Sequence, residues 1–149
     1  MSVTASGLFL PTFRDIMDTS QLTIDWDLET HKGALFSNSI TPNFDSDTAY
    51  GVSPYNANEV TGTNWASGGI ALVGTTVSIS SGVLILDATD VSVASTTLSN
   101  ARCYLLYADA SAGNEAMVLV NFGADYSTSN GTFAITWAAG GYASLDLTP

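Results

Sequence analysis

From residue 70 onward the chain is a succession of short apolar segments divided by turn-forming residues. Short strands at close spacing, joined by Gly-containing turns, are typical of antiparallel sandwiches and barrels. The sequence therefore predicts a mainly β fold, an antiparallel β-sandwich or barrel-like single domain. The predicted strands are 70–79, 83–88, 90–95, 102–109, 116–123, 132–137 and 143–147. Asn130-Gly131 is expected to form a hairpin turn, because both residues tolerate positive φ angles.

One short helix is expected near the N-terminus, within residues 8–18 (LFLPTFRDIMD). Pro11 suits the first turn of a helix, and Asp18 with the two residues after it suits its end. The apolar side chains recur at helical spacing and should face a sheet or a neighbouring subunit. They are Phe9, Phe13, Ile16 and Met17. The chain thus divides into an N-terminal arm with a short helix at 1–20 and a β-sandwich domain at 21–149.

After the helix the apolar residues change to strand periodicity. Apolar and polar residues alternate in 22–28, which predicts a half-buried strand although two Asp residues weaken it. Residues 31–37 predict a second strand. Residues 38–66 are rich in polar residues, Pro and Gly, and a loop of this length in a compact domain is usually functional or forms an interface.

The charge balance disfavours two classes of partner. The chain has 14 acidic and three basic residues, a net charge of -11. A nucleic-acid backbone and an anionic membrane both attract clustered Lys and Arg, so neither is an expected partner. No apolar run approaches the roughly 20 residues of a membrane helix. The N-terminal residues do not resemble a signal peptide, so folding in a cytosol is expected.

The residues that carry chemistry are few. His31, on a probable strand, is expected to be exposed or hydrogen-bonded, and Cys103 is expected to be a buried core residue. The loop at 59–72 lacks the phosphate-binding glycine motifs, and a strand rather than a helix follows it. Gly68 and Gly69 are therefore expected to begin that strand or form a bulge. We predict no catalytic residue and no cofactor.

Two acidic groups could hold a cation. Asp25, Asp27 and Glu29 alternate along the first predicted strand, and Asp45 with Asp47 match the first two ligands of a calcium loop. The later ligands of such a loop are missing, and aspartates commonly form turns. The prediction is no metal site, with Ca²⁺ at either group as the alternative.

Several motifs together resemble a family of tailed-bacteriophage structural proteins. They are HKGALFSNSITPNFDSDTAYG at 31–51, NEVTGTNWASGGIAL at 58–72, ARCYLLYAD at 101–109 and NFGADYSTSNGTFAITW at 121–137. Members of that family have K-V-A-L-F, T-P-x-x-D-x-D-T, N-E-V-x-G-T-x-Y-x-A-G-G, A-R-Y-A-V-I-Y and D-F-G-x-D-x-S-x-x-N-G-T-F-x-I-x-W. The chain departs from these patterns at Gly33, where Val is usual, and at Trp65 and Cys103, where Tyr is usual.

The resemblance implies a virion component without an active site, and a capsid decoration or cement protein is the favoured assignment. Such a protein would be made in the cytoplasm of the bacterial host and lie on the capsid surface. Its partners would be the major capsid protein and copies of itself, with a trimer as the expectation by analogy. A phage tail or host-surface carbohydrate-binding module, using Tyr50, Tyr55 and Trp65, is the alternative. A glycosidase using the carboxylates of Asp25, Asp27 and Glu29 is the third possibility.

A small β module has limited room to bury the apolar N-terminal arm together with the aromatic residues of loop 38–66. We therefore predict that some of these side chains pack against another subunit or the capsid. The candidate interface residues are Leu8, Phe9, Leu10, Phe13, Phe44, Tyr50, Tyr55 and Trp65. Trp65 could instead complete the core.

Overall fold

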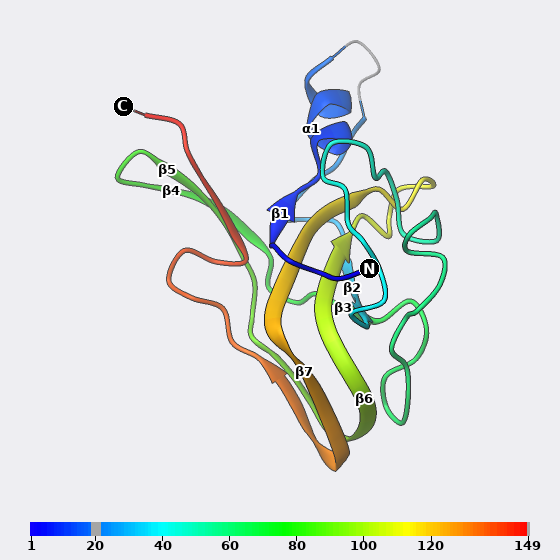
Figure 1. Ribbon diagram of the computed structural model, residues 1–149. Helices are drawn as coiled ribbons and strands as arrows, with labels where there is room; N and C mark the ends of the chain where they lie inside the picture. The colour runs from blue at the N-terminus through cyan, green and yellow to red at the C-terminus, as the bar shows by residue number, and fades with distance from the viewer. Residues whose placement is uncertain (19–21, 149) are drawn as a thin grey trace.

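The computed structural model, which describes residues 1–18 and 22–148, contains two antiparallel sheets and one short helix (Figure 1). The larger sheet has the order β1-β7-β6-β2-β3 and the smaller one β4-β5-β8. The elements are β1 Gly7–Leu8, α1 Leu10–Met17, β2 Lys32–Phe36, β3 Ile70–Ala71, β4 Thr76–Ser80, β5 Val83–Asp87, β6 Val91–Tyr107, β7 Ala116–Ile135 and β8 Ala143–Asp146. The predicted fold class, a mainly β and sandwich-like antiparallel fold with one short helix, is confirmed.

The larger sheet is the middle layer of the molecule, because both of its faces are buried. Along β6, Tyr104 and Leu106 belong to an apolar cluster that includes residues of β5, whereas Cys103 and Leu105 belong to a second cluster on the opposite face. The part of loop 38–66 that contains Ile40 and Tyr55 covers that second face, and both of these side chains are buried there. The long loop is therefore a structural layer of the fold.

The N-terminal arm is part of the larger sheet. β1 pairs with β7, with Gly7 opposite Leu119 and Leu8 opposite Val118. Val3 and Phe9 on either side of this pairing are fully buried. Residues 1–18 thus contribute to the core. The predicted boundary between residues 20 and 21 lies outside the described residues.

The expected helix is present as α1, which places Pro11 in its first turn. Its last turn ends at Met17, where the backbone N–H of Asp18 donates to the carbonyl of Arg14 at 2.9 Å. Phe9 precedes the helix as its N-cap residue. The ring of Phe13 packs against that of Trp26, with centroids 5.7 Å apart.

The strand predicted at 22–28 is wrong, because residues 26–28 form a turn. The carboxylate of Asp25 accepts hydrogen bonds from the backbone N–H groups of Asp27 at 3.4 Å and Leu28 at 3.2 Å. The N–H of Glu29 donates to the carbonyl of Asp25 at 3.2 Å. An Asp side chain that bonds nearby backbone in this way competes with strand formation, and here it prevails over the apolar alternation.

The strand predicted at 70–79 is divided into β3 and β4, which belong to different sheets. Between them the N–H of Leu72 donates to the carbonyl of His31 at 2.8 Å, and the carbonyl of Val73 accepts from the N–H of Thr89. The chain therefore leaves the larger sheet at this point and enters the smaller one. The strands predicted at 31–37, 83–88 and 143–147 are present as β2, β5 and β8.

Two pairs of predicted strands are each a single long strand. Segments 90–95 and 102–109 lie mostly in β6, of 17 residues, and segments 116–123 and 132–137 lie mostly in β7, of 20 residues. The hairpin predicted at Asn130-Gly131 is wrong. Asn130 has a φ of 49° inside β7, where the pairing with β6 shifts register between Gly131 and Thr128.

These register shifts bend the β6–β7 ribbon. Ser95 and Asn100 of β6 also have positive φ angles, 56° and 57°, and irregular pairing accompanies each of them. Bulges of this kind bend a strand and increase its twist. In Figure 1 the orange end of β7 turns back at the bottom of the view and runs up toward the smaller sheet. One strand thus has two arms, and they face each other.

Candidate binding site in the bend of β7

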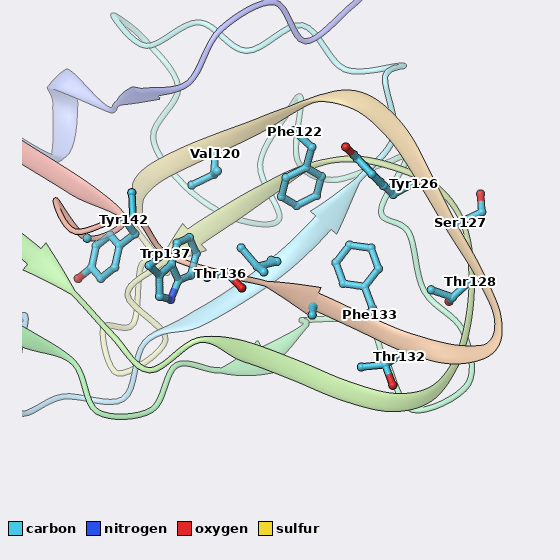
Figure 2. A pocket seen from close by; sticks show the side chains of 14 residues that line it. Val120, Phe122, Tyr126, Ser127, Thr128, Thr132, Phe133, Thr136, Trp137 and Tyr142 are labelled. Atoms are coloured by element: carbon cyan, nitrogen blue, oxygen red, sulfur yellow. The ribbon is translucent and has the colours of Figure 1, made fainter.

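A cleft with a volume of about 680 Å³ lies between the two arms of β7 (Figure 2). The first arm contributes Val120, Phe122 and Tyr126. The returning arm and the residues after it contribute Phe133, Ile135, Thr136, Trp137 and Tyr142. Side chains that are distant along one strand therefore meet because the strand is bent.

The aromatic rings of the cleft pack edge to face or at a tilt. The ring of Phe122 lies 6.0 Å from that of Tyr126, at 85°, and 6.1 Å from that of Phe133, at 57°. Phe133 also contacts Trp65 in the core, with ring centroids 5.5 Å apart. Phe133 is buried, whereas Tyr126 is 51% exposed. The buried ring forms the floor of the cleft and the exposed ring its rim.

Hydrogen bonds hold the end of the cleft in place. The backbone N–H of Trp137 donates to the carboxylate of Asp90 at 2.9 Å, and its indole N–H donates to the carbonyl of Thr89 at 3.1 Å. The ring of Tyr142 packs edge-on against Trp137 at 5.9 Å. These contacts tie the rings of Trp137 and Tyr142 to their neighbours. The two side chains therefore lose little conformational freedom when a ligand binds.

The chemistry of the cleft is apolar and aromatic, with hydroxyl groups at its edge. Ser127, Thr128, Thr132 and Thr136 supply the hydroxyls, and none of the described residues that line the cleft is charged. A concave, preformed, mainly apolar surface with a few polar groups is the usual form of a binding site. This cleft can accept an apolar side chain of another protein or a ring that stacks on aromatic faces.

Three of the predicted interface residues are core residues of the single chain. Phe9 and Trp65 have 0% of their surface exposed, and Tyr55 has 2%. Each is surrounded by rings of its own chain, as when Phe9 and Tyr55 pack edge-on at 5.8 Å. The prediction that these side chains contact a partner is therefore corrected. For Trp65, the alternative role in the core is the correct one.

The other five predicted interface residues are at least partly accessible. Phe44 packs on Phe9 at 5.2 Å, and Tyr50 stacks on Tyr107 at 4.5 Å. Leu10 is 56% exposed. The partly buried members are Leu8, Phe13, Phe44 and Tyr50. None of the eight predicted residues lines the β7 cleft.

The sequence did not indicate the cleft, because its residues are predicted to lie at alternate positions of two separate strands. Phe122, Tyr126, Phe133 and Trp137 all lie in the motif at 121–137, the most specific part of the resemblance. The sequence predicts a hairpin turn at Asn130-Gly131, inside that motif, and so divides it into two strands. A polar run that contains Asn-Gly within one strand is the signal that could have indicated a bend.

The loop at 59–72 closes on itself through one carboxylate. Glu59 accepts hydrogen bonds from the N–H of Gly68 at 2.7 Å and from the hydroxyls of Ser67 at 2.7 Å and Tyr50 at 2.9 Å. Gly68 and Gly69 have φ angles of 86° and 73°, and they lead directly into β3. The expected role of these glycines at the start of a strand is confirmed.

The predicted acidic groups make turns. Oδ2 of Asp47 accepts hydrogen bonds from the N–H of Asn43 at 2.7 Å and the hydroxyl of Tyr55 at 3.2 Å. Asp25 caps the turn at 26–28, and a hydrogen bond with Asp27 lowers the pKa of Asp25 while it raises the pKa of Asp27. In residues 1–18 and 22–148, no three His, Cys, Asp or Glu side chains converge as metal ligands do.

The two reactive residue types are both buried. The Nε2–H of His31 donates to the carbonyl of Asp25 at 3.0 Å, and burial lowers the pKa of His31. Cys103 is fully buried in the second apolar cluster, and burial raises the pKa of its thiol to about 12. The expectation of a buried core cysteine is confirmed. A thiol with this pKa is not a nucleophile at neutral pH.

In the described part of the chain, no helix is both long and apolar enough to cross a membrane. Comparisons with the models of known protein families, with curated proteins and with solved structures found no match.

Proposed function

We propose that the chain is a non-enzymatic structural protein of a bacteriophage virion. It is a capsid decoration or cement protein that binds the head shell through the β7 cleft. The resemblance of the motifs at 31–51, 58–72, 101–109 and 121–137 supports the virion assignment. The partner is the major capsid protein, and the protein lies on the capsid surface.

The observation that carries the proposal is the contrast between the cleft and the rest of the surface. The chain has a net charge of -11, yet the described residues lining the cleft are uncharged and five of them are aromatic: Phe122, Tyr126, Phe133, Trp137 and Tyr142. Aromatic side chains are enriched where protein partners bind, and charged ones are depleted there. An acidic surface keeps a protein made in many copies soluble before assembly.

A second candidate function uses the same cleft. Rings that are flanked by hydroxyl groups, such as Tyr126 beside Ser127 and Thr128, can stack on and hydrogen-bond to a sugar. This arrangement favours the host-surface carbohydrate-binding module over the enzyme. Its residues differ from the Tyr50, Tyr55 and Trp65 expected from the sequence.

The test is co-sedimentation of the purified protein with empty capsids that lack it. Tyr126→Ala removes the exposed ring, and Ala134→Trp fills the cleft without removing a core side chain, because Ala134 is exposed. Both variants are expected to weaken capsid binding at least tenfold. Ala124→Trp is the matched control, because Ala124 is exposed on β7 and is not among the residues lining the cleft.

Wild-type protein that does not bind capsids overturns the decoration assignment. Capsid binding that both cleft variants retain overturns the cleft as the contact. Binding of wild-type protein to a glycan array, lost in Tyr126→Ala, establishes the carbohydrate-binding alternative in its place.

A further inference from the structure

The strand β4 is an open edge of the smaller sheet. Within the described residues it pairs only with β5, and all five of its residues are exposed. β4 and β5 extend away from the rest of the molecule toward the upper left of Figure 1. The outer backbone N–H and C=O groups of an edge strand are available to pair with another strand.

The other sheet edges have features that disfavour pairing with a further strand, and β4 lacks these features. β1 and β3, the edges of the larger sheet, are two residues long. β8, the opposite edge of the smaller sheet, ends in Asp146. The sequence of β4, TVSIS, has no charge and no proline, and its register with β5 is regular. Proteins commonly protect exposed edges with short strands, charges, prolines or bulges, so an edge with none of these is suited to pairing.

One face of the same sheet exposes apolar side chains. The pairing of β4 with β5 puts Val77 beside Leu86 and Ile79 beside Leu84. Leu86 is buried against the larger sheet, but Ile79, farther out, is 79% exposed. On the other side of β5, Leu145 lies opposite Leu84. The apolar face therefore continues beyond the part that the larger sheet covers.

The symmetric sequence of β4, TVSIS, suits a second copy of this chain as the partner, and the charge distribution permits that contact at β4. Each copy has a net charge of -11, so most contacts between copies bring carboxylates together, which is unfavourable. Residues 70–86, which contain β4, have no charged side chain. Two copies that meet at β4 bury apolar residues against each other and keep their carboxylates apart. A two-fold contact of this kind is self-complementary.

We propose that two copies of the chain pair antiparallel through β4, about a two-fold axis at Ser78. All five residues of β4 then pair, and Val77 of each copy lies opposite Ile79 of the other. The two smaller sheets become one six-stranded sheet with a continuous apolar face. The proposal concerns the free protein and does not depend on the capsid. It gives a dimer in place of the trimer expected by analogy.

Sedimentation equilibrium at low micromolar and higher concentrations tests the association. Wild-type protein is expected to reach twice the 15.5 kDa mass of one chain. Ile79→Lys, at an exposed position, should weaken the dimer at least tenfold and leave the melting temperature nearly unchanged. Ser144→Lys makes the same change of charge on exposed β8 and should leave the dimer intact. A wild-type monomer, or any oligomer that Ile79→Lys does not weaken, overturns the proposal.

A disulfide tests the register. Directly opposed residues of an antiparallel pair have Cα atoms about 4.5–5.5 Å apart, which suits a disulfide. Ser78→Cys is expected to form a covalent dimer under mild oxidation, because the native Cys103 is buried and does not compete. Ser144→Cys, on the opposite edge, should stay monomeric on a non-reducing gel. Equal cross-linking of the two variants overturns the β4 contact. The cleft variant Ala134→Trp should dimerise normally, so a failure of this proposal is distinct from a failure to bind capsids.

Discussion

The phenol ring of Tyr104 fills the space that a side chain at Gly33 would need, so a Cβ atom at Gly33 would overlap the ring. The two residues lie on the adjacent strands β2 and β6, where Leu35 is directly opposite Tyr104. Tyr104 is fully buried. The absence of a side chain at Gly33 is therefore what allows the ring of Tyr104 to occupy this position.

Gly33→Val is therefore expected to destabilise the fold by about 1–3 kcal/mol or more, because a buried ring must move. Tyr104→Ala alone should cost about 3–5 kcal/mol, through the cavity that it leaves. In the double variant the valine occupies part of that cavity, so the total loss should be smaller than the sum. Urea unfolding of the four proteins measures the coupling. Strictly additive losses would contradict this account.

Trp65→Ala is expected to lower the free energy of unfolding by about 3–5 kcal/mol. The indole is fully buried and packs edge-on against Tyr104 at 6.2 Å as well as against Phe133. Leu10→Ala is the comparison, since Leu10 is exposed and its loss should change stability by no more than about 0.5 kcal/mol. Thermal melting of both variants checks the difference. Similar melting temperatures would show that Trp65 is not a core residue.

The stability of the fold should decrease below about pH 6.5, the ordinary pKa of histidine, in part because of His31. Burial lowers the pKa of His31 in the folded chain, and its buried Nδ1 has no hydrogen-bond partner among the described residues. The imidazole of His31 is therefore protonated more readily in the unfolded chain than in the folded one. As a result, the free energy of unfolding falls as the pH decreases. His31→Gln should show a smaller fall between pH 7.5 and 5.5 in urea unfolding. An identical fall in both proteins would exclude His31 as a cause.

Cys103 should resist alkylation in the native protein. Its thiol is buried, and burial raises its pKa to about 12, so the thiolate that reacts is scarce at pH 8. Reaction with iodoacetamide, followed by mass spectrometry, is expected to be slow in buffer and complete in concentrated urea. Rapid labelling in buffer would mean that the second face of the larger sheet opens readily.

Removal of divalent cations should not change the melting temperature. The carboxylate of Asp47 already accepts hydrogen bonds from Asn43 and Tyr55, and that of Asp25 caps its own turn. Melting curves with EDTA and with added Ca²⁺ should coincide. A loss of several degrees in EDTA, restored by Ca²⁺, would revive the calcium site at Asp45 and Asp47 or at Asp25, Asp27 and Glu29.

Local patterns in the sequence were sufficient for the class of fold and for many of its elements. The short apolar run that begins the segment 83–88 and the helical spacing at 8–18 predicted β5 and α1 correctly. Burial of Cys103 also followed from its apolar neighbours. These properties depend on side-chain spacing over a few residues, and such spacing can be read directly. Side-chain spacing did not predict the turn at 26–28, because the hydrogen bonds from backbone N–H groups to the carboxylate of Asp25 outweighed the alternation of apolar and polar residues.

Only the tertiary structure decided which aromatic residues are buried and which line a cleft. Trp65 and Tyr55 belong to one polar loop, and they are core residues because that loop packs against both faces of the larger sheet, with Trp65 in the first cluster and Tyr55 in the second. Phe122 and Phe133 face each other because β6 and β7 change register and bend at Ser95, Asn100 and Asn130. The local sequence of a strand specifies to which face of the sheet each side chain points. What covers that side chain depends on distant segments, and the pairing of two long strands brings them together.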